Sequence, residues 1–110
     1  MRKKIIAVDF DGTLCTNRWP QIGAPNTELI EYLKEQRNQG ARLILWTCRS
    51  GMLLNEAVLW CSIFDLYFDA INENLPEQIA AFGEDTRKIY ADEYIDDRAS
   101  NRLIKTDERE

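Results

Sequence analysis

Two aspartates separated by a single residue, Asp9 and Asp11, follow an apolar run in the stretch DFDGT. In an extended chain, residues i and i+2 point the same way, so both carboxylates can face one site. Gly12 lets the backbone turn sharply at this point and approach a ligand closely. Asp and Gly also favour ordinary turns, but the whole pattern directly after a buried strand favours a chemical role.

A second polar group, Thr47-Cys48-Arg49, follows the apolar segment RLILW. A hydroxyl, small residues, an arginine and a following helix can together hold phosphate oxygens through side-chain and backbone donors. Taken alone, the segment is equally typical of a helix cap with Arg49 as a surface residue.

The last two groups are Lys88, which precedes a short strand-like piece, and the acidic pair Asp96 and Asp97 in YIDDR. Adjacent carboxylates repel each other unless a cation compensates them. The chain has no histidine, and hard oxygen ligands favour Mg²⁺. Individually, Lys88 could be a solvated lysine and Asp97 a helix-capping acid. Four polar groups at four strand ends are harder to explain as coincidence.

Hydrophobic patterning predicts the elements that must position these groups. Buried strands are expected at 4–10 and 42–47, a weaker strand at 67–71, and strand-like pieces at 88–91 and 94–97. Helices are expected from Asn26 or Thr27 to about 39, stopping at Gly40, at 52–63 and at 76–82, with helical turns at 99–104. Residues 15–25 contain two prolines and a glycine and are predicted to be a loop. The expected apolar helix faces are Leu29, Ile30 and Leu33 in the first helix and Leu54, Ala57, Val58 and Cys61 in the second.

Alternating strands and helices predict an α/β fold, a three-layer doubly wound parallel sheet with right-handed crossovers. The 110 residues suffice for one domain with a modest core. In such sheets, ligands bind at the carboxyl ends of the strands. The four polar groups should therefore meet at one edge.

Composition narrows the classes of function. A net charge of −5 argues against a general nucleic-acid binder, so a nucleic-acid partner is not expected, although a local basic pocket remains possible. No apolar run reaches the roughly 18 residues of a membrane span, and we expect a cytoplasmic protein. The three cysteines, Cys15, Cys48 and Cys61, favour reduced thiols over a disulfide framework. The lack of histidine excludes catalytic triads that need one.

In order, DFDGT, LWTCR, Lys88 and YIDDR resemble the four signature motifs of the haloacid dehalogenase superfamily of phosphohydrolases. The resemblance extends from Ile5 to about Leu103. It implies a Rossmann-like doubly wound sheet and Mg²⁺-dependent hydrolysis of phosphomonoesters through an aspartyl-phosphate. By this resemblance, Asp9 is the nucleophile and a direct Mg²⁺ ligand, and Asp11 is the general acid/base with its carbonyl on the metal.

The same resemblance gives the remaining residues their roles. Thr47 is expected to bond the transferring phosphoryl group, and Lys88 to steady the nucleophile and the phosphate charge. Asp96 and Asp97 are expected to bind metal, with Asp97 favoured as the direct ligand by similarity to phage polynucleotide 3′-phosphatase domains. Arg49, together with the adjacent Cys48, is expected on the substrate phosphate.

Many members of this superfamily carry an inserted cap domain, which this chain has no room for. The gaps at 15–25 and 72–87 are too short to hold a separate domain, so an open, capless site is predicted. Trp19 in the first gap could be a lid, a contact in a homo-oligomer, or part of a packed loop.

Two other classes of protein are alternatives to the phosphatase. A receiver-like phospho-signalling module needs a phosphoacceptor aspartate after the third strand, where this chain has Asn72-Glu73-Asn74. A catalytically idle subunit that binds metal or phosphate would not require both Asp9 and Asp11. The physiological substrate is not determined by these patterns.

Overall fold

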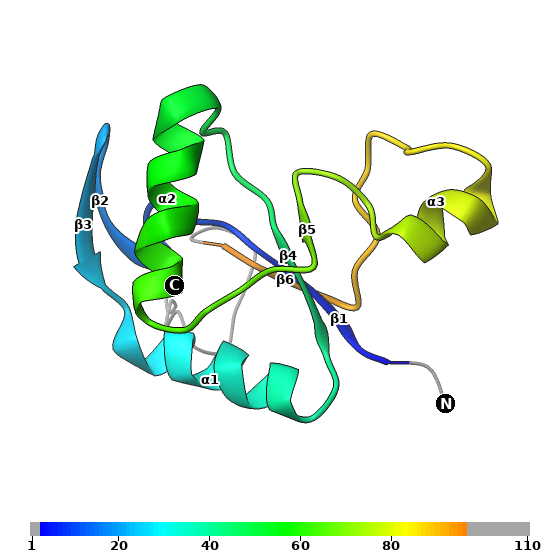
Figure 1. Cartoon of the computed structure of the whole chain (residues 1–110), viewed down its shortest axis with the longest axis horizontal. Helices are drawn as coiled ribbons and strands as arrows, with labels where there is room; N and C mark the ends of the chain where they lie inside the picture. The colour runs from blue at the N-terminus through cyan, green and yellow to red at the C-terminus, as the bar shows by residue number, and fades with distance from the viewer. Residues whose placement is uncertain (1–2, 97–110) are drawn as a thin grey trace, which may run out of the picture.

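The apolar run that precedes Asp9 forms the strand β1 (Ile5–Val8), whose four residues are all buried. The computed structural model describes residues 3–96 of the chain. Within it, β1 lies inside a four-stranded sheet of order β5-β4-β1-β6 (Figure 1). The other strands are β4 (Arg42–Leu45), β5 (Ala70–Ile71) and β6 (Glu93–Ile95). Every pairing in this sheet is parallel, so the predicted α/β class with a parallel sheet is confirmed.

Three helices connect these strands: α1 (Thr27–Asn38), α2 (Gly51–Ile63) and α3 (Pro76–Phe82). The Asn26 side chain caps α1 by accepting a hydrogen bond from the Leu29 N–H at 3.2 Å. Gly40 follows the helix with a positive φ of 102°, which a glycine adopts without strain. The predicted start and stop of this helix are therefore confirmed.

The sheet has a separate apolar cluster on each face. Ile6 and Val8 of β1 pack with residues of α1 and α2, whereas Ile5 and Ala7 pack with the segment 75–91. Because neighbouring side chains of a strand point to opposite faces, β1 contributes to both clusters. Figure 1 shows α1 and α3 on opposite sides of the strands. None of the seven α3 residues is buried, so the second face is covered mainly by Leu75, Ile89 and Ala91.

Residues 15–25 are not a loop, contrary to the prediction. They form an antiparallel hairpin of β2 (Cys15–Arg18) and β3 (Gln21–Pro25), which turns at a cis Trp19-Pro20 bond. Apart from Cys15, the residues of β2 are exposed, so the hairpin has no alternating apolar pattern to signal it. The strands approach closely at Gly23, where a Cβ would collide with the Thr16 carbonyl oxygen.

The predicted strand at 88–91 is also wrong. The Tyr90 N–H donates to the side-chain Oδ1 of Asn74 instead of joining a strand ladder, and β6 begins only at Glu93. Asp97, the helical turns at 99–104 and the polar tail lie outside the described residues. Within residues 3–96, no helix is long and apolar enough to cross a membrane.

Candidate functional site

Asp9 is the first residue after the inner strand β1, and its carboxylate is half-buried. Its N–H donates to the Ile95 carbonyl oxygen at 2.9 Å, which ties it to the end of β6. Its Oδ1 accepts the Phe10 N–H at 2.7 Å. The backbone therefore fixes both the position and the orientation of this carboxylate.

The register of the sheet places three predicted site residues at one edge. Val8 pairs with Leu45 of β4 and with Ile95 of β6, so the carboxyl ends of these strands are level. Asp9 and Asp96 follow directly beyond the ends of β1 and β6, and Thr47 follows the end of β4 after one intervening residue, Trp46. Asp96 is half-buried, like Asp9.

Thr47 is buried and held from two sides. Its N–H donates to Oδ1 of Asn72 at 2.8 Å, and its Oγ1 accepts the Arg49 N–H at 3.1 Å. Since Oγ1 acts as an acceptor in this contact, the hydroxyl hydrogen remains able to donate to a ligand. Asn72 has a positive φ of 56° at the end of β5, a position that Asn tolerates better than most residues. No sequence pattern predicted that Asn72 holds the backbone of Thr47. Cys48, next to Thr47, is exposed.

Arg49 forms a bidentate ion pair with Asp11. Its Nε donates to Asp11 Oδ2 at 2.9 Å, and its Nη2 donates to Oδ1 at 2.8 Å. The arginine is only 1% exposed. Nη2 also donates to the Gln21 carbonyl oxygen of β3 at 3.2 Å, so the pair connects the DFDGT turn to the hairpin.

Two aromatic rings enclose this guanidinium. Its Cζ lies 5.1 Å from the Phe10 ring centroid and 5.0 Å from that of Trp19, within the range of a cation–π contact. The hydrogen bonds to Asp11 raise the pKa of Arg49 further, so the arginine stays charged. Trp19 is 53% exposed and covers Arg49 from the hairpin. In this arrangement Arg49 faces Asp11, and its predicted contact with a substrate phosphate stays a prediction.

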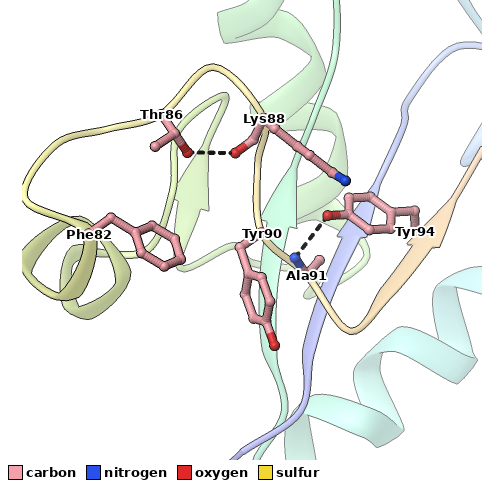
Figure 2. Close-up of a pocket in the computed structure, with 6 residues that line it drawn as sticks. All are labelled: Phe82, Thr86, Lys88, Tyr90, Ala91 and Tyr94. Carbon is pink, nitrogen blue, oxygen red and sulfur yellow. Dashed lines mark hydrogen bonds between the residues drawn. The ribbon is translucent and has the colours of Figure 1, made fainter.

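Lys88 is exposed and lies on the 83–92 segment, beside a pocket of about 450 Å³. Figure 2 shows its side chain extending toward the ring of Tyr94 on β6. The pocket is lined by Phe82, Thr86, Lys88, Tyr90, Ala91 and Tyr94.

The backbone on both sides of Lys88 is held by the side chain of Asn74, which is fully buried. Its Nδ2 donates to Asp85 Oδ1 at 2.9 Å and to the Thr86 carbonyl oxygen at 3.2 Å. Its Oδ1 accepts the Tyr90 N–H at 2.7 Å. Sequence reasoning missed Asn74, because an asparagine between two elements is typical of any turn.

The side chains at the strand ends carry oxygen donors of the type that a hard cation binds. The carboxylates of Asp9 and Asp96 and the hydroxyl of Thr47 provide oxygen ligands, which Mg²⁺ prefers. Within residues 3–96, no cluster of three or more Cys, Asp or Glu side chains is placed to hold a metal. Asp97, the predicted direct ligand, lies outside these residues.

The fold and these residues define a class: an α/β protein with a parallel sheet that gathers oxygen-bearing side chains at its carboxyl edge. No protein-family model matches the chain, and no curated protein does. Among solved structures, it is similar to one described as the conserved protein coded by a locus from Bacteroides thetaiotaomicron. The two share 44% identity with a TM-score of 0.77, over 88% of this chain and 78% of the other. The chain belongs to the same family as this conserved Bacteroides protein.

Proposed function

We propose that the protein is a Mg²⁺-dependent phosphomonoester hydrolase with an open, capless site on a doubly wound sheet of the haloacid dehalogenase type. The observation that carries the proposal is the placement of Asp9. It follows the inner strand β1, lies between the ends of β4 and β6, and its Oδ1 accepts the Phe10 N–H. Such an edge is where α/β sheets bind ligands.

In the proposed reaction, a carboxylate oxygen of Asp9 attacks phosphorus in line. The new bond to Asp9 forms as the bond from phosphorus to the alcohol oxygen breaks, and the alcohol oxygen takes a proton from Asp11. Water then attacks the aspartyl-phosphate and gives its proton back to Asp11. Inorganic phosphate leaves, and both carboxyl groups return to their starting states.

The remaining residues are proposed to neutralise the negative charge of the phosphoryl group and to position its oxygens. Mg²⁺, held by Asp9, the Asp11 carbonyl and the acids Asp96 and Asp97, would neutralise charge on the phosphoryl group. Thr47 donates its hydroxyl hydrogen to a phosphoryl oxygen, and the Lys88 ammonium lowers the repulsion between phosphate and carboxylate.

The Arg49 pair sets a condition on this chemistry. Both Asp11 oxygens accept hydrogen bonds from Arg49, so Asp11 must first release at least one of these bonds and take up a proton from solvent before it can act as a proton donor. The same movement frees a guanidinium N–H for the phosphate, beside the exposed Cys48. Arg49 is thus proposed to alternate between Asp11 and the substrate.

The receiver-like alternative gains no support at the end of β5. A phosphoacceptor aspartate would be needed there, and the chain instead has Asn72, whose amide accepts the Thr47 N–H. The idle-subunit alternative differs from the proposal in predicting no turnover.

The test is hydrolysis of p-nitrophenyl phosphate with millimolar Mg²⁺ by the wild type and by Asp9→Asn. We expect the variant to lose activity by a factor on the order of 10³ or more, because the nucleophile is removed. A chelator should abolish wild-type activity, and added Mg²⁺ should restore it.

Asp65→Asn is the matched control, since Asp65 is exposed beyond the end of α2 and the change in charge is the same. Its activity should equal that of the wild type. Equal rates for Asp9→Asn and wild type would exclude Asp9 as the nucleophile. A wild type that hydrolyses no phosphomonoester would favour the idle subunit.

A further inference from the structure

We infer that the pocket beside Lys88 binds an aromatic group on the alcohol side of the substrate, so that the preferred substrates are phosphomonoesters whose alcohol carries an aromatic group. The inference rests on the proposed function and adds a substrate class to it. It stands on the ring geometry, the engaged hydroxyls and the charge of the pocket (Figure 2).

Aromatic rings form the walls of the pocket. The ring centroids of Phe82 and Tyr90 lie 6.4 Å apart at an interplanar angle of 76°. Tyr94 has a tilted contact with Trp46, with centroids 5.7 Å apart, and Trp46 is 40% exposed. Rings in offset or edge-to-face arrangements favour further flat aromatic groups. At about 450 Å³, the pocket is in the size range of small-molecule sites.

The hydroxyl groups in the pocket already have partners. Thr86 donates to the Lys88 carbonyl oxygen at 2.9 Å, and the Tyr90 hydroxyl donates to Asp92 at 3.4 Å. The Tyr94 hydroxyl donates to the Ile89 carbonyl oxygen and accepts the Ala91 N–H at 3.1 Å. A simple sugar phosphate, which offers hydroxyls but no ring system to the pocket, would find few free partners here. An aromatic group needs none.

The distribution of charge in the pocket indicates how a ligand would be oriented. Lys88 is charged, and the other described residues that line the pocket are neutral, with no carboxylate among them. This combination suits a ligand with an anionic phosphate near Lys88 and an uncharged ring between the aromatic walls.

The pocket opens on the same face of the sheet as the proposed nucleophile. Ala7 of β1 and Tyr94 of β6 are register partners, and both contribute to the cluster on the α3 side. Asp9 follows Ala7 by two residues, so its side chain continues the same face beyond the strand end. A phosphate at Asp9 can therefore have its alcohol group directed into the pocket.

The pocket is also preformed. Asn74 holds the backbone on both sides of Lys88, and the Tyr94 hydroxyl fixes its ring against residues 89–91. Because the walls are already held in this way, little conformational entropy of the pocket is lost when a ligand binds.

The first experiment compares kcat/KM for benzyl phosphate and ethyl phosphate, whose leaving alcohols are both primary and uncharged. We expect the wild type to prefer benzyl phosphate, and Phe82→Ala to lower the benzyl-to-ethyl ratio by about tenfold through the lost ring contact. Phe82 is 49% exposed, so its replacement should leave the fold intact. Tyr67→Ala, an exposed aromatic residue before β5, should keep the wild-type ratio.

A binding measurement separates this inference from the proposed function. Calorimetry with benzylphosphonate and ethylphosphonate needs no turnover, and the wild type should bind the benzyl compound more tightly than Phe82→Ala does. Aromatic preference in binding without any hydrolysis would support the pocket and overturn the hydrolase. Hydrolysis with equal ratios in wild type and Phe82→Ala would keep the hydrolase and overturn the pocket, and a failure of both measurements would overturn both.

The aromatic group could be a simple aryl ring or a nucleobase. Adding a nucleoside 5′-monophosphate to the same kinetic comparison distinguishes the two sources. If Phe82→Ala lowers kcat/KM for the nucleotide by the same factor as for benzyl phosphate, the substrate class extends to nucleotides. A loss confined to benzyl phosphate would restrict it to simple aryl groups.

Discussion

On one side of Asp9, the Asp11–Arg49 pair is enclosed between the rings of Phe10 and Trp19, while on the other side Lys88 is exposed beside an open pocket. We call these the Arg49 cluster (Phe10, Asp11, Trp19 and Arg49) and the Lys88 pocket. The first is held by a buried ion pair. The second is held by the neutral amide of Asn74 and by tyrosine and threonine hydroxyls.

This difference indicates that the two regions have different roles in the proposed site, catalysis for the Arg49 cluster and substrate selection for the Lys88 pocket. A buried ion pair holds its geometry tightly, because separating the charges leaves one of them unpaired in a poorly solvated place. Such a cluster keeps Asp11 and Arg49 in place until a substrate phosphate offers Arg49 a second anionic partner, as the proposed exchange requires. The hydrogen bonds of Asn74, Thr86 and Tyr94 around the pocket do not use the Lys88 ammonium, which leaves this cation available for a ligand and suits substrate selection. The following predictions test whether the two regions differ in this way.

The largest effect on stability is expected from Arg49→Ala. The substitution leaves Asp11 without its bidentate partner, and we expect the free energy of unfolding to fall by about 3 kcal/mol. Urea denaturation followed by tryptophan fluorescence measures this change.

Arg37→Ala is the matched control for that variant. Arg37 pairs with Asp69 at 3.3 Å, but its side chain is 37% exposed, and surface ion pairs contribute about 1 kcal/mol or less. Equal losses for the two variants would contradict the view that the Arg49 cluster is held mainly by its buried charge pair.

A smaller effect is expected from Asn74→Ala in the Lys88 pocket. The change leaves the Tyr90 N–H and the Asp85 carboxylate without their buried partner, which should lower the free energy of unfolding by about 2 kcal/mol. Because the segment around Lys88 loosens, kcat/KM for benzyl phosphate should fall as well. Asn38→Ala, at the exposed end of α1, should change neither quantity. An Asn74→Ala protein with wild-type stability would show that this network does not hold the pocket.

The smallest effect concerns thiol reactivity, which reports local opening of the hairpin. Burial raises the pKa of the Cys15 thiol and raises that of Cys61 to about 12, so both hold less reactive thiolate near pH 8 than an ordinary thiol does. The exposed Cys48 should therefore be alkylated first. In Arg49→Ala, Cys15 at the start of the hairpin should react about tenfold faster, and Cys61 in α2 should not.

Mass spectrometry of peptides after timed alkylation measures these three rates. Equal acceleration of Cys15 and Cys61 would indicate global loosening and would remove the distinction between the hairpin and the rest of the core.

Much of the fold was predictable because local patterns and tertiary packing agree. The run at 4–10 was predicted as a strand buried on both faces, and its central residues Ile5–Val8 form such a strand. The Asn26 cap and the Gly40 stop bound α1 as expected. The prediction failed for the hairpin at 15–25, where burial of apolar side chains does not determine the local structure. The hairpin at 15–25 is mostly exposed and depends on backbone pairing past Gly23, which leaves no apolar periodicity to read.

The candidate site divides in the same way. Residue types and strand ends were sufficient to predict that Asp9, Thr47 and Asp96 lie at one edge, because parallel strands bring their carboxyl ends together. Lys88 lies on the 83–92 segment and not at the end of a strand, so its predicted place at a strand end is wrong. Asn72 and Asn74 were not selected, since their roles arise from hydrogen bonds to segments that are distant in sequence. No local pattern encodes such partners.

The sequence by itself determined the α/β class, the placement of Asp9 after a buried strand, and the lack of any histidine for catalysis or metal binding. Only the tertiary structure decided that Arg49 pairs with Asp11, that Trp19 of the hairpin covers Arg49, and that Lys88 lies beside an aromatic pocket. The physical reason is the separation along the chain of the residues that interact. Strand and helix patterns arise from neighbours in the chain, whereas an ion pair or a pocket wall depends on which distant side chains the packed fold brings together.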